Sequence, residues 1–103
     1  MTDRLAQLLA LLDAEPGDAF CLYGIAQEHA KRGDDRIAIE YYDRTIAADP
    51  DSLYAYYHKA RSQQALDDDA GAAISLRAGL ARARAAGDTK AAGELAALLD
   101  ELT

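Results

Sequence analysis

Three residues of this sequence have side chains that commonly take part in catalysis: Cys21, His29 and His58. A cysteine becomes an effective nucleophile when a histidine beside it takes up its proton. Nothing in the sequence predicts that either histidine approaches Cys21, and no cation that would favour a thiolate is adjacent to it. We therefore expect Cys21 to be inert and partly buried, as unpaired cysteines usually are.

The consecutive carboxylates Asp67, Asp68 and Asp69 could hold a cation or form an acid/base pair. No calcium-type loop of oxygen ligands follows them, and a helical pattern begins at this point. Aspartate is favoured at a helix N-terminus, because it accepts bonds from free backbone N–H groups. We expect all three to cap that helix. The sequence contains no HExxH, CxxC or glycine-rich phosphate motif, so we expect no enzyme activity, no metal and no cofactor.

The aromatic residues offer chemistry of a different kind. The six tyrosines and the single phenylalanine all lie between Phe20 and Tyr57, and there is no tryptophan. Tyrosine rings carry a polar tip on an apolar body, which suits surfaces that bind other proteins. Whether these rings form such a surface depends on the elements that position them.

Composition limits the possible partners. The 18 acidic residues outnumber the 11 basic ones and give a net charge of −7. An acidic domain repels phosphate backbones, so we expect no nucleic-acid binding. No apolar run is long enough to cross a membrane, and a single cysteine fits a reducing compartment. We expect a cytoplasmic protein without membrane contacts.

Apolar residues recur at helical spacing along the whole chain, and valine, a strong strand former, is absent. The pattern predicts six helices: one ending before Pro16, then about 19–31, 35–49, 53–66, 69–86 and 89–102. The expected N-caps are Thr2, Asp18, Asp34 or Asp35, Ser52 and Thr89. Gly33 is expected at a left-handed helix end. The fold class is all-α.

Identical residues recur at an offset of 34 positions. The pairs include Ala14 and Ala48, Pro16 and Pro50, Tyr23 and Tyr57, Ala26 and Ala60, Asp34 and Asp68, Asp35 and Asp69, and Ala38 and Ala72. Such a period predicts stacked helical hairpins, because one hairpin cannot bury its apolar face alone. The paired alanines are small where two helices must approach closely.

A 34-residue helix–turn–helix period of this kind resembles the tetratricopeptide repeat. In the first complete copy the resemblance rests on Leu22, Ile25, Ala26, His29, Gly33, Ala38, Tyr42, Thr45 and Pro50. In the second copy it rests on Tyr56, Ala60, Ala72, Leu76, Gly79 and Leu80. That copy has Lys59, Asp67 and Arg84 where the family usually has Leu, Gly and Pro. Its second helix should therefore run past the usual stop.

The resemblance implies an α-solenoid, a right-handed stack of antiparallel helical hairpins. We divide the single domain, residues 1–103, into four parts. Residues 1–18 are a truncated N-terminal repeat helix, 19–52 the first repeat, 53–88 the second repeat and 89–103 a C-terminal capping helix. His29 and Tyr42 are expected in the core.

The resemblance also implies a concave groove, which in the family is lined by the first helix of each repeat. Helical spacing places Phe20, Tyr23, Gln27 and Lys31 on one stripe, and Tyr54, Tyr57, His58, Arg61 and Gln64 on the neighbouring stripe. We expect this groove to bind a peptide or helix of a partner protein. The open alternative is that the rings only fill space between hairpins.

Basic residues lie on or near the same helices, namely Lys31, Arg32, Lys59 and Arg61. They leave open an acidic or C-terminal carboxylate ligand despite the net charge. The family's known clamp for chaperone tails has a lysine and an asparagine where this chain has Tyr23 and Gln27, and an asparagine at His58. That clamp is absent.

The leading functional hypothesis is therefore a non-enzymatic protein–protein interaction module. The alternative is a self-associating scaffold, in which the Leu-rich first and last helices pack end to end. We expect a monomer or a weak homodimer.

Overall fold

A computed structural model of the protein describes residues 3–103 and contains six α-helices in that range, with no strand. The helices are α1 (Arg4–Ala14), α2 (Ala19–Lys31), α3 (Asp35–Ala48), α4 (Leu53–Ala65), α5 (Asp69–Ala86) and α6 (Thr89–Leu102). The prediction of six helices in an all-α fold is confirmed. The predicted cap Thr2 lies outside the described residues, and the side chain of Asp3 caps α1 by accepting from the Leu5 N–H.

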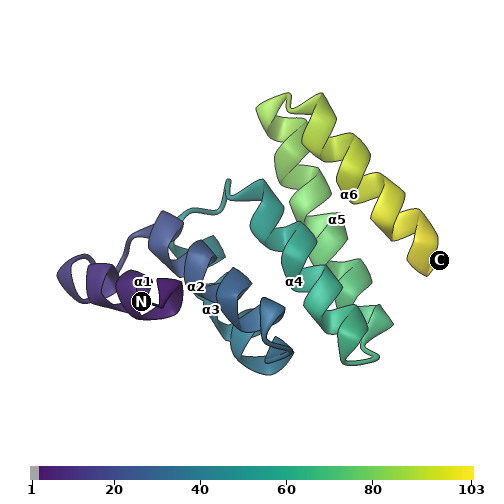
Figure 1. Cartoon of the computed structure of the whole chain (residues 1–103). Helices are drawn as coiled ribbons and strands as arrows, with labels where there is room; N and C mark the ends of the chain where they lie inside the picture. Colours follow the sequence, from purple (N-terminus) through teal and green to yellow (C-terminus); the bar gives the residue numbers. More distant parts are fainter. Residues whose placement is uncertain (1–2) are drawn as a thin grey trace.

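Helices that are neighbours in sequence are neighbours in space (Figure 1). α2 packs on α3 and α4 packs on α5, so each pair forms a hairpin, while α1 and α6 cover the two ends. The stack measures 41 × 29 × 20 Å along its principal axes. α2 and α4 touch each other directly, which brings the first helices of both hairpins to one surface.

The N-cap residues agree with the prediction only in part. Asp18 accepts hydrogen bonds from the backbone N–H groups of Phe20 and Cys21, as predicted. Asp34 and Ser52 occupy the N-cap positions of α3 and α4, but neither side chain makes a capping bond. The prediction for Thr89 was wrong, because Asp88 caps α6 and accepts from the Ala91 N–H.

Asp67 also differs from expectation. Of the three consecutive carboxylates, Asp68 caps α5 and Asp69 lies in its first turn, but Asp67 ends the preceding turn with φ of 61°. This left-handed conformation matches that of Gly33, 34 positions earlier, where φ is 81°. Asp67 therefore occupies a glycine position, and a side chain there costs free energy.

The core is built on close approaches between paired helices. Ala26 and Ala38 are fully buried between α2 and α3, and Ala60 and Ala72 are fully buried between α4 and α5. Gly79 of α5 lies so close to α4 that a Cβ atom there would be 2.6 Å from Tyr56 Cβ. Small residues at these points let the hairpins close and the larger side chains interdigitate.

The second hairpin runs past the usual stop, as its lack of a third proline predicted. α5 ends at Ala86, and Gly87 follows it in the left-handed conformation. The Asp88 N–H donates to the Ala83 carbonyl, which closes the helix end. None of the described helices combines the length and apolar character that crossing a membrane requires.

The conformation of Asp67 yields a stability prediction. Replacing it with glycine (Asp67→Gly) should raise the free energy of unfolding by roughly 0.5–1 kcal/mol, because glycine adopts positive φ without a steric penalty. Thermal unfolding followed by circular dichroism measures the change. Asp67→Asn removes the same charge and should gain less, so a glycine variant no more stable than the asparagine one would contradict the backbone explanation.

The approach of α4 to α5 yields a second prediction. Alanine is the better helix former by about 1 kcal/mol, yet Gly79→Ala should lower the melting temperature, since its methyl group would meet Tyr56 Cβ and force the helices apart. Gly93→Ala is the matched control, because a Cβ at Gly93 of α6 has no contact within 4 Å. The control should be neutral or stabilising. Equal behaviour of the two variants would contradict the prediction.

Candidate functional site

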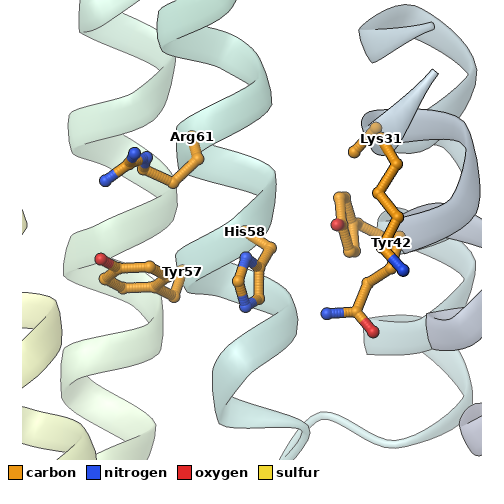
Figure 2. A pocket seen from close by; sticks show the side chains of 7 residues that line it. Lys31, Tyr42, Tyr57, His58 and Arg61 are labelled. Carbon is orange, nitrogen blue, oxygen red and sulfur yellow. The ribbon is translucent and has the colours of Figure 1, made fainter. Parts of the chain in front are cut away.

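A hollow of about 490 Å³ opens between α2, α3 and α4, and we call it the central hollow. Its lining consists of Gln27, Ala30, Lys31, Tyr42, Tyr57, His58 and Arg61. Figure 2 shows His58 between Tyr57 and Tyr42, with Arg61 on the Tyr57 side and Lys31 on the Tyr42 side. Five residues predicted from the sequence to line a groove therefore surround one space: Gln27, Lys31, Tyr57, His58 and Arg61.

The floor of the central hollow is a cluster of rings centred on His58. The imidazole stacks on Tyr42 with centroids 6.3 Å apart and an interplanar angle of 19°. It meets Tyr57 edge to face at 5.2 Å and lies 6.0 Å from Tyr23. Tyr23 and Tyr42 also pack together at 6.0 Å. These four residues form the aromatic cluster, which holds α2, α3 and α4 together at this surface.

Two lining residues, Tyr42 and Ala30, were not predicted as part of the site. Tyr42 was expected in the core and is indeed buried, at 1% exposure. Its ring nevertheless lines the hollow and packs against Tyr23 of α2 and His58 of α4. One signal was available in the sequence: the equivalent residue in the second repeat is Leu76, so the first repeat carries a phenol hydroxyl that packing alone does not require.

Burial sets the protonation of the aromatic cluster. Desolvation, with a smaller contribution from the nearby Arg61 charge, lowers the pKa of His58 below its ordinary value of 6.5, so the imidazole is neutral at pH 7. Desolvation also raises the pKa values of Tyr23 and Tyr42 above their ordinary value of 10.0. The phenols therefore keep their protons, and the Tyr23 oxygen accepts a hydrogen bond of 3.1 Å from Gln27 Nε2.

The two charged residues that line the central hollow are both positive. Lys31 and Arg61 are exposed side chains on its rim, and no Asp or Glu lines it. Lys31 Nζ lies 3.5 Å from Glu28 Oε1. Across residues 3–103, no carboxylate lies within ion-pair distance of Arg61. The other expected cations are paired elsewhere, Lys59 with Asp43 and Arg32 with Asp3.

A second, smaller hollow of about 300 Å³ lies at the beginnings of α2 and α4, and we call it the apolar hollow. Its lining consists of Ala19, Phe20, Tyr23, Asp49, Ser52, Leu53, Tyr54 and Ala55. Phe20 is 76% exposed, so its ring does not fill space between hairpins, and Tyr54 is 37% exposed. Tyr23 borders this hollow and packs in the aromatic cluster, which places the two hollows side by side.

Gln64 is the one predicted groove residue that lines neither hollow. Its side chain is half-buried near the end of α4. The equivalent residue of the first repeat is Ala30, which does line the central hollow. The assignment of Gln64 to the groove therefore stays a prediction.

Of the three residues considered first for catalysis, His58 lines the central hollow, whereas Cys21 and His29 line neither hollow. Cys21 is 3% exposed, and burial raises the pKa of its thiol. Its sulfur lies 3.5 Å from Asp18 Oδ2, a neighbour that does not activate a nucleophile. His29 stacks on Tyr41 at 5.9 Å and is partly buried, so it lies at the edge of the core and not within it. In the described part of the chain, no group of three or more potential metal ligands converges.

Comparisons with known proteins agree with this architecture. No protein-family model matches the chain, and no curated protein matches it. Solved structures do. A tetratricopeptide repeat domain protein from Salinibacter ruber, determined by NMR, superposes with a TM-score of 0.79 and 30% identity over 85% of this chain and 89% of that one.

Two further structures extend the comparison. A crystal structure of a tetratricopeptide repeat domain protein from Salinibacter ruber gives a TM-score of 0.75 and 29% identity over 82% of this chain and 96% of that one. A Bordetella parapertussis protein gives a TM-score of 0.85 over 99% of this chain and 89% of that one. Its identity is 24%, so it supports the fold alone.

The lowered pKa of His58 leads to a prediction about stability and pH. The unfolded chain binds a proton at His58 more readily than the native chain, so stability should fall as pH drops through about 6.5. His58→Gln removes this proton uptake. The melting temperature of the variant should therefore decline less than that of the wild type between about pH 7.5 and about pH 5.5. Parallel declines in both proteins would show that His58 titrates normally.

Proposed function

Because this chain belongs to the tetratricopeptide repeat family, whose members are interaction modules, we propose that it binds a segment of a partner protein along the central and apolar hollows. Together we call these two hollows the binding groove. The protein acts in this proposal by recognition and not by catalysis. The cytoplasmic location and the repeat division at residues 19–52 and 53–88 are part of the same proposal.

The observation that carries the proposal is the exposure of large rings beside two adjoining hollows. A fold of this size gains stability by burying its only phenylalanine, yet Phe20 is largely exposed. Tyr54, which lines the apolar hollow with Phe20, and Tyr57, which lines the central hollow, are also partly accessible. Concave, aromatic-lined surfaces with a few polar groups are the usual sites of peptide recognition.

The rings offer anchors that cost little entropy to fix. The packing of Tyr23 against Tyr42 and His58, with its hydrogen bond to Gln27, holds the middle of the groove in place. A surface that is already ordered loses less conformational freedom on binding. Tyr23 is thus a positioning residue between the hollows, and Phe20, Tyr54 and Tyr57 are the contact residues.

Self-association is the second candidate, and it is supported by one end of the stack. Leu9 and Leu11 of α1 are 39% and 57% exposed, so this helix presents apolar surface outward. On α6, Leu95 and Leu98 are buried and Leu99 and Leu102 pack partly against the core. A scaffold of this kind would therefore associate through α1 and not through α6.

Selection from a random peptide library tests the proposed function. Wild-type protein should enrich peptides that the groove variant Phe20→Ala/Tyr57→Ala does not retain, because truncation of two contact rings removes most of the anchoring surface. Ile74→Ala is the matched control, since Ile74 is a 67% exposed apolar residue outside both hollows. Circular dichroism should show unchanged folding of all variants.

Two outcomes would contradict parts of this proposal. Equal retention of the enriched peptides by wild type and groove variant would place the binding surface elsewhere. Light scattering that shows a stable dimer, lost in Leu9→Ser/Leu11→Ser and unaffected in the groove variant, would favour the scaffold.

A further inference from the structure

We infer that the central hollow binds the side-chain carboxylate of an Asp or Glu in the partner segment, held between Arg61 and Lys31, while an apolar side chain of the same segment occupies the apolar hollow. This inference rests on the proposed function and names the chemistry of the ligand.

The charged residues that line the central hollow have the opposite sign to the net charge of the chain. The chain carries 18 acidic and 11 basic residues, so an average surface hollow should be lined by more carboxylates than cations. The central hollow has the opposite lining, with two cations and no carboxylate. Charges nearer than about 10 Å dominate the local potential, because more distant ones are screened at ordinary ionic strength. The Glu28 carboxylate lies beside Lys31, but Arg4 also contacts it and offsets its charge. An anionic group is therefore the complementary ligand.

The two cations that line the central hollow are Arg61 and Lys31. Arg61 comes from α4 and Lys31 from the last turn of α2, and both line the hollow. Figure 2 shows them on opposite sides of His58, with Arg61 extending on the Tyr57 side. With no carboxylate at ion-pair distance in the described chain, the Arg61 guanidinium keeps its donors available for a bidentate contact. Lys31 and Arg4 both contact the Glu28 carboxylate, and Arg4 Nε lies 3.0 Å from Glu28 Oε1. Because Glu28 keeps Arg4 as a partner, the Lys31 ammonium can leave it and bind another anion.

The floor of the hollow strengthens such a contact. The half-buried rings of Tyr57 and His58 exclude water from one side, and an ion pair gains strength where water is displaced. His58 is neutral and Tyr23 and Tyr42 keep their protons, so none of the three adds a negative charge that would repel a carboxylate.

The position of the hollow along the helices favours a side chain over a chain terminus. Chain ends are captured by convergent backbone N–H groups or, in the chaperone-tail clamp, by lysine and asparagine side chains that this chain replaces with Tyr23, Gln27 and His58. The residues that line the central hollow come from the middle and end of α2 and from within α3 and α4, so no helix start contributes N–H groups there. Its polar partners are side chains, which can grip a carboxylate in the middle of a segment.

The two hollows also fix a spacing. Tyr54 and Arg61 lie seven residues apart on α4, which is roughly 10 Å along a helix. An extended chain covers that distance in about three residues. The partner segment should therefore carry an apolar, preferably aromatic, residue about three positions from an Asp or Glu.

The test begins with the peptides enriched from the random library by wild-type protein. They should show Asp or Glu about three positions from an aromatic residue, more often than the starting library does. Synthetic copies in which that acid is changed to its amide should bind more weakly by roughly threefold to tenfold. Fluorescence anisotropy at low and high salt measures this, and the difference should shrink at high salt.

Variants then assign the effect to its residues. Arg61→Gln should abolish most of the discrimination between acid and amide peptides, and Lys31→Gln should reduce it. Arg77→Gln is the matched control, because it removes the same charge from an exposed position of α5 outside both hollows. A control that loses discrimination to the same extent would reduce the effect to net charge and overturn the inference.

The remaining outcomes separate the inference from the proposed function. Enriched peptides that are neutral or basic, or that bind equally as acid and amide, overturn the carboxylate site and leave groove binding intact. Binding that depends on a free C-terminus, and is lost on amidation of the chain end, also overturns it. Failure of wild-type protein to enrich any peptide over the groove variant overturns the proposed function itself.

Discussion

The whole structure depends on how closely the two helices of each hairpin can approach. Ala26 faces Ala38 and Ala60 faces Ala72 with no exposed surface at any of the four. Larger side chains there would separate the helices and open the interior, which proteins tolerate poorly because cores are close-packed. The close approach also fixes the rotation of α2 and α4 about their axes. Their remaining faces must then turn toward one surface, where the two hollows form.

The two hairpins fill the space around these alanines differently, and the difference creates the site. In the first hairpin α2 carries Leu22 and α3 carries the ring of Tyr42. At the equivalent positions of the second hairpin α4 carries the ring of Tyr56 and α5 carries Leu76, and all four side chains are buried. The exchange keeps the total volume similar, as stable cores require. The Tyr56 hydroxyl is turned to the loop and donates to the Pro50 carbonyl at 2.8 Å. The Tyr42 ring instead stacks on His58. Of the two tyrosines, only Tyr42 therefore lines the central hollow.

Sequence reasoning predicted the helices and their stacking because both follow from local periodicity and from a period of 34 residues. It was less accurate where the outcome depended on a single backbone conformation, as at Asp67, or on one residue of register, as between Asp88 and Thr89. For the site, helical spacing identified which side chains share a face of one helix. Helical spacing does not show how far a side chain from another helix reaches, and for this reason Tyr42 of α3 was not predicted to line the central hollow. Nor could it show which turn of a helix borders a hollow, and Gln64, which shares the face of Arg61, lines neither one.

The net charge of the chain did not predict the charge of the residues that line the central hollow. The acidic residues of this chain gather at helix starts and turns, where Asp18, Asp68 and Asp88 serve as caps. Those positions are set by the needs of backbone N–H groups, and they lie at the ends of the hairpins. The backbone N–H groups in the middle turns of α2 and α4 are bonded within the helix and need no cap, and these turns carry Gln27, His58 and Arg61. A chain that places its carboxylates at helix ends can therefore be acidic overall and still present a positive hollow between its hairpins.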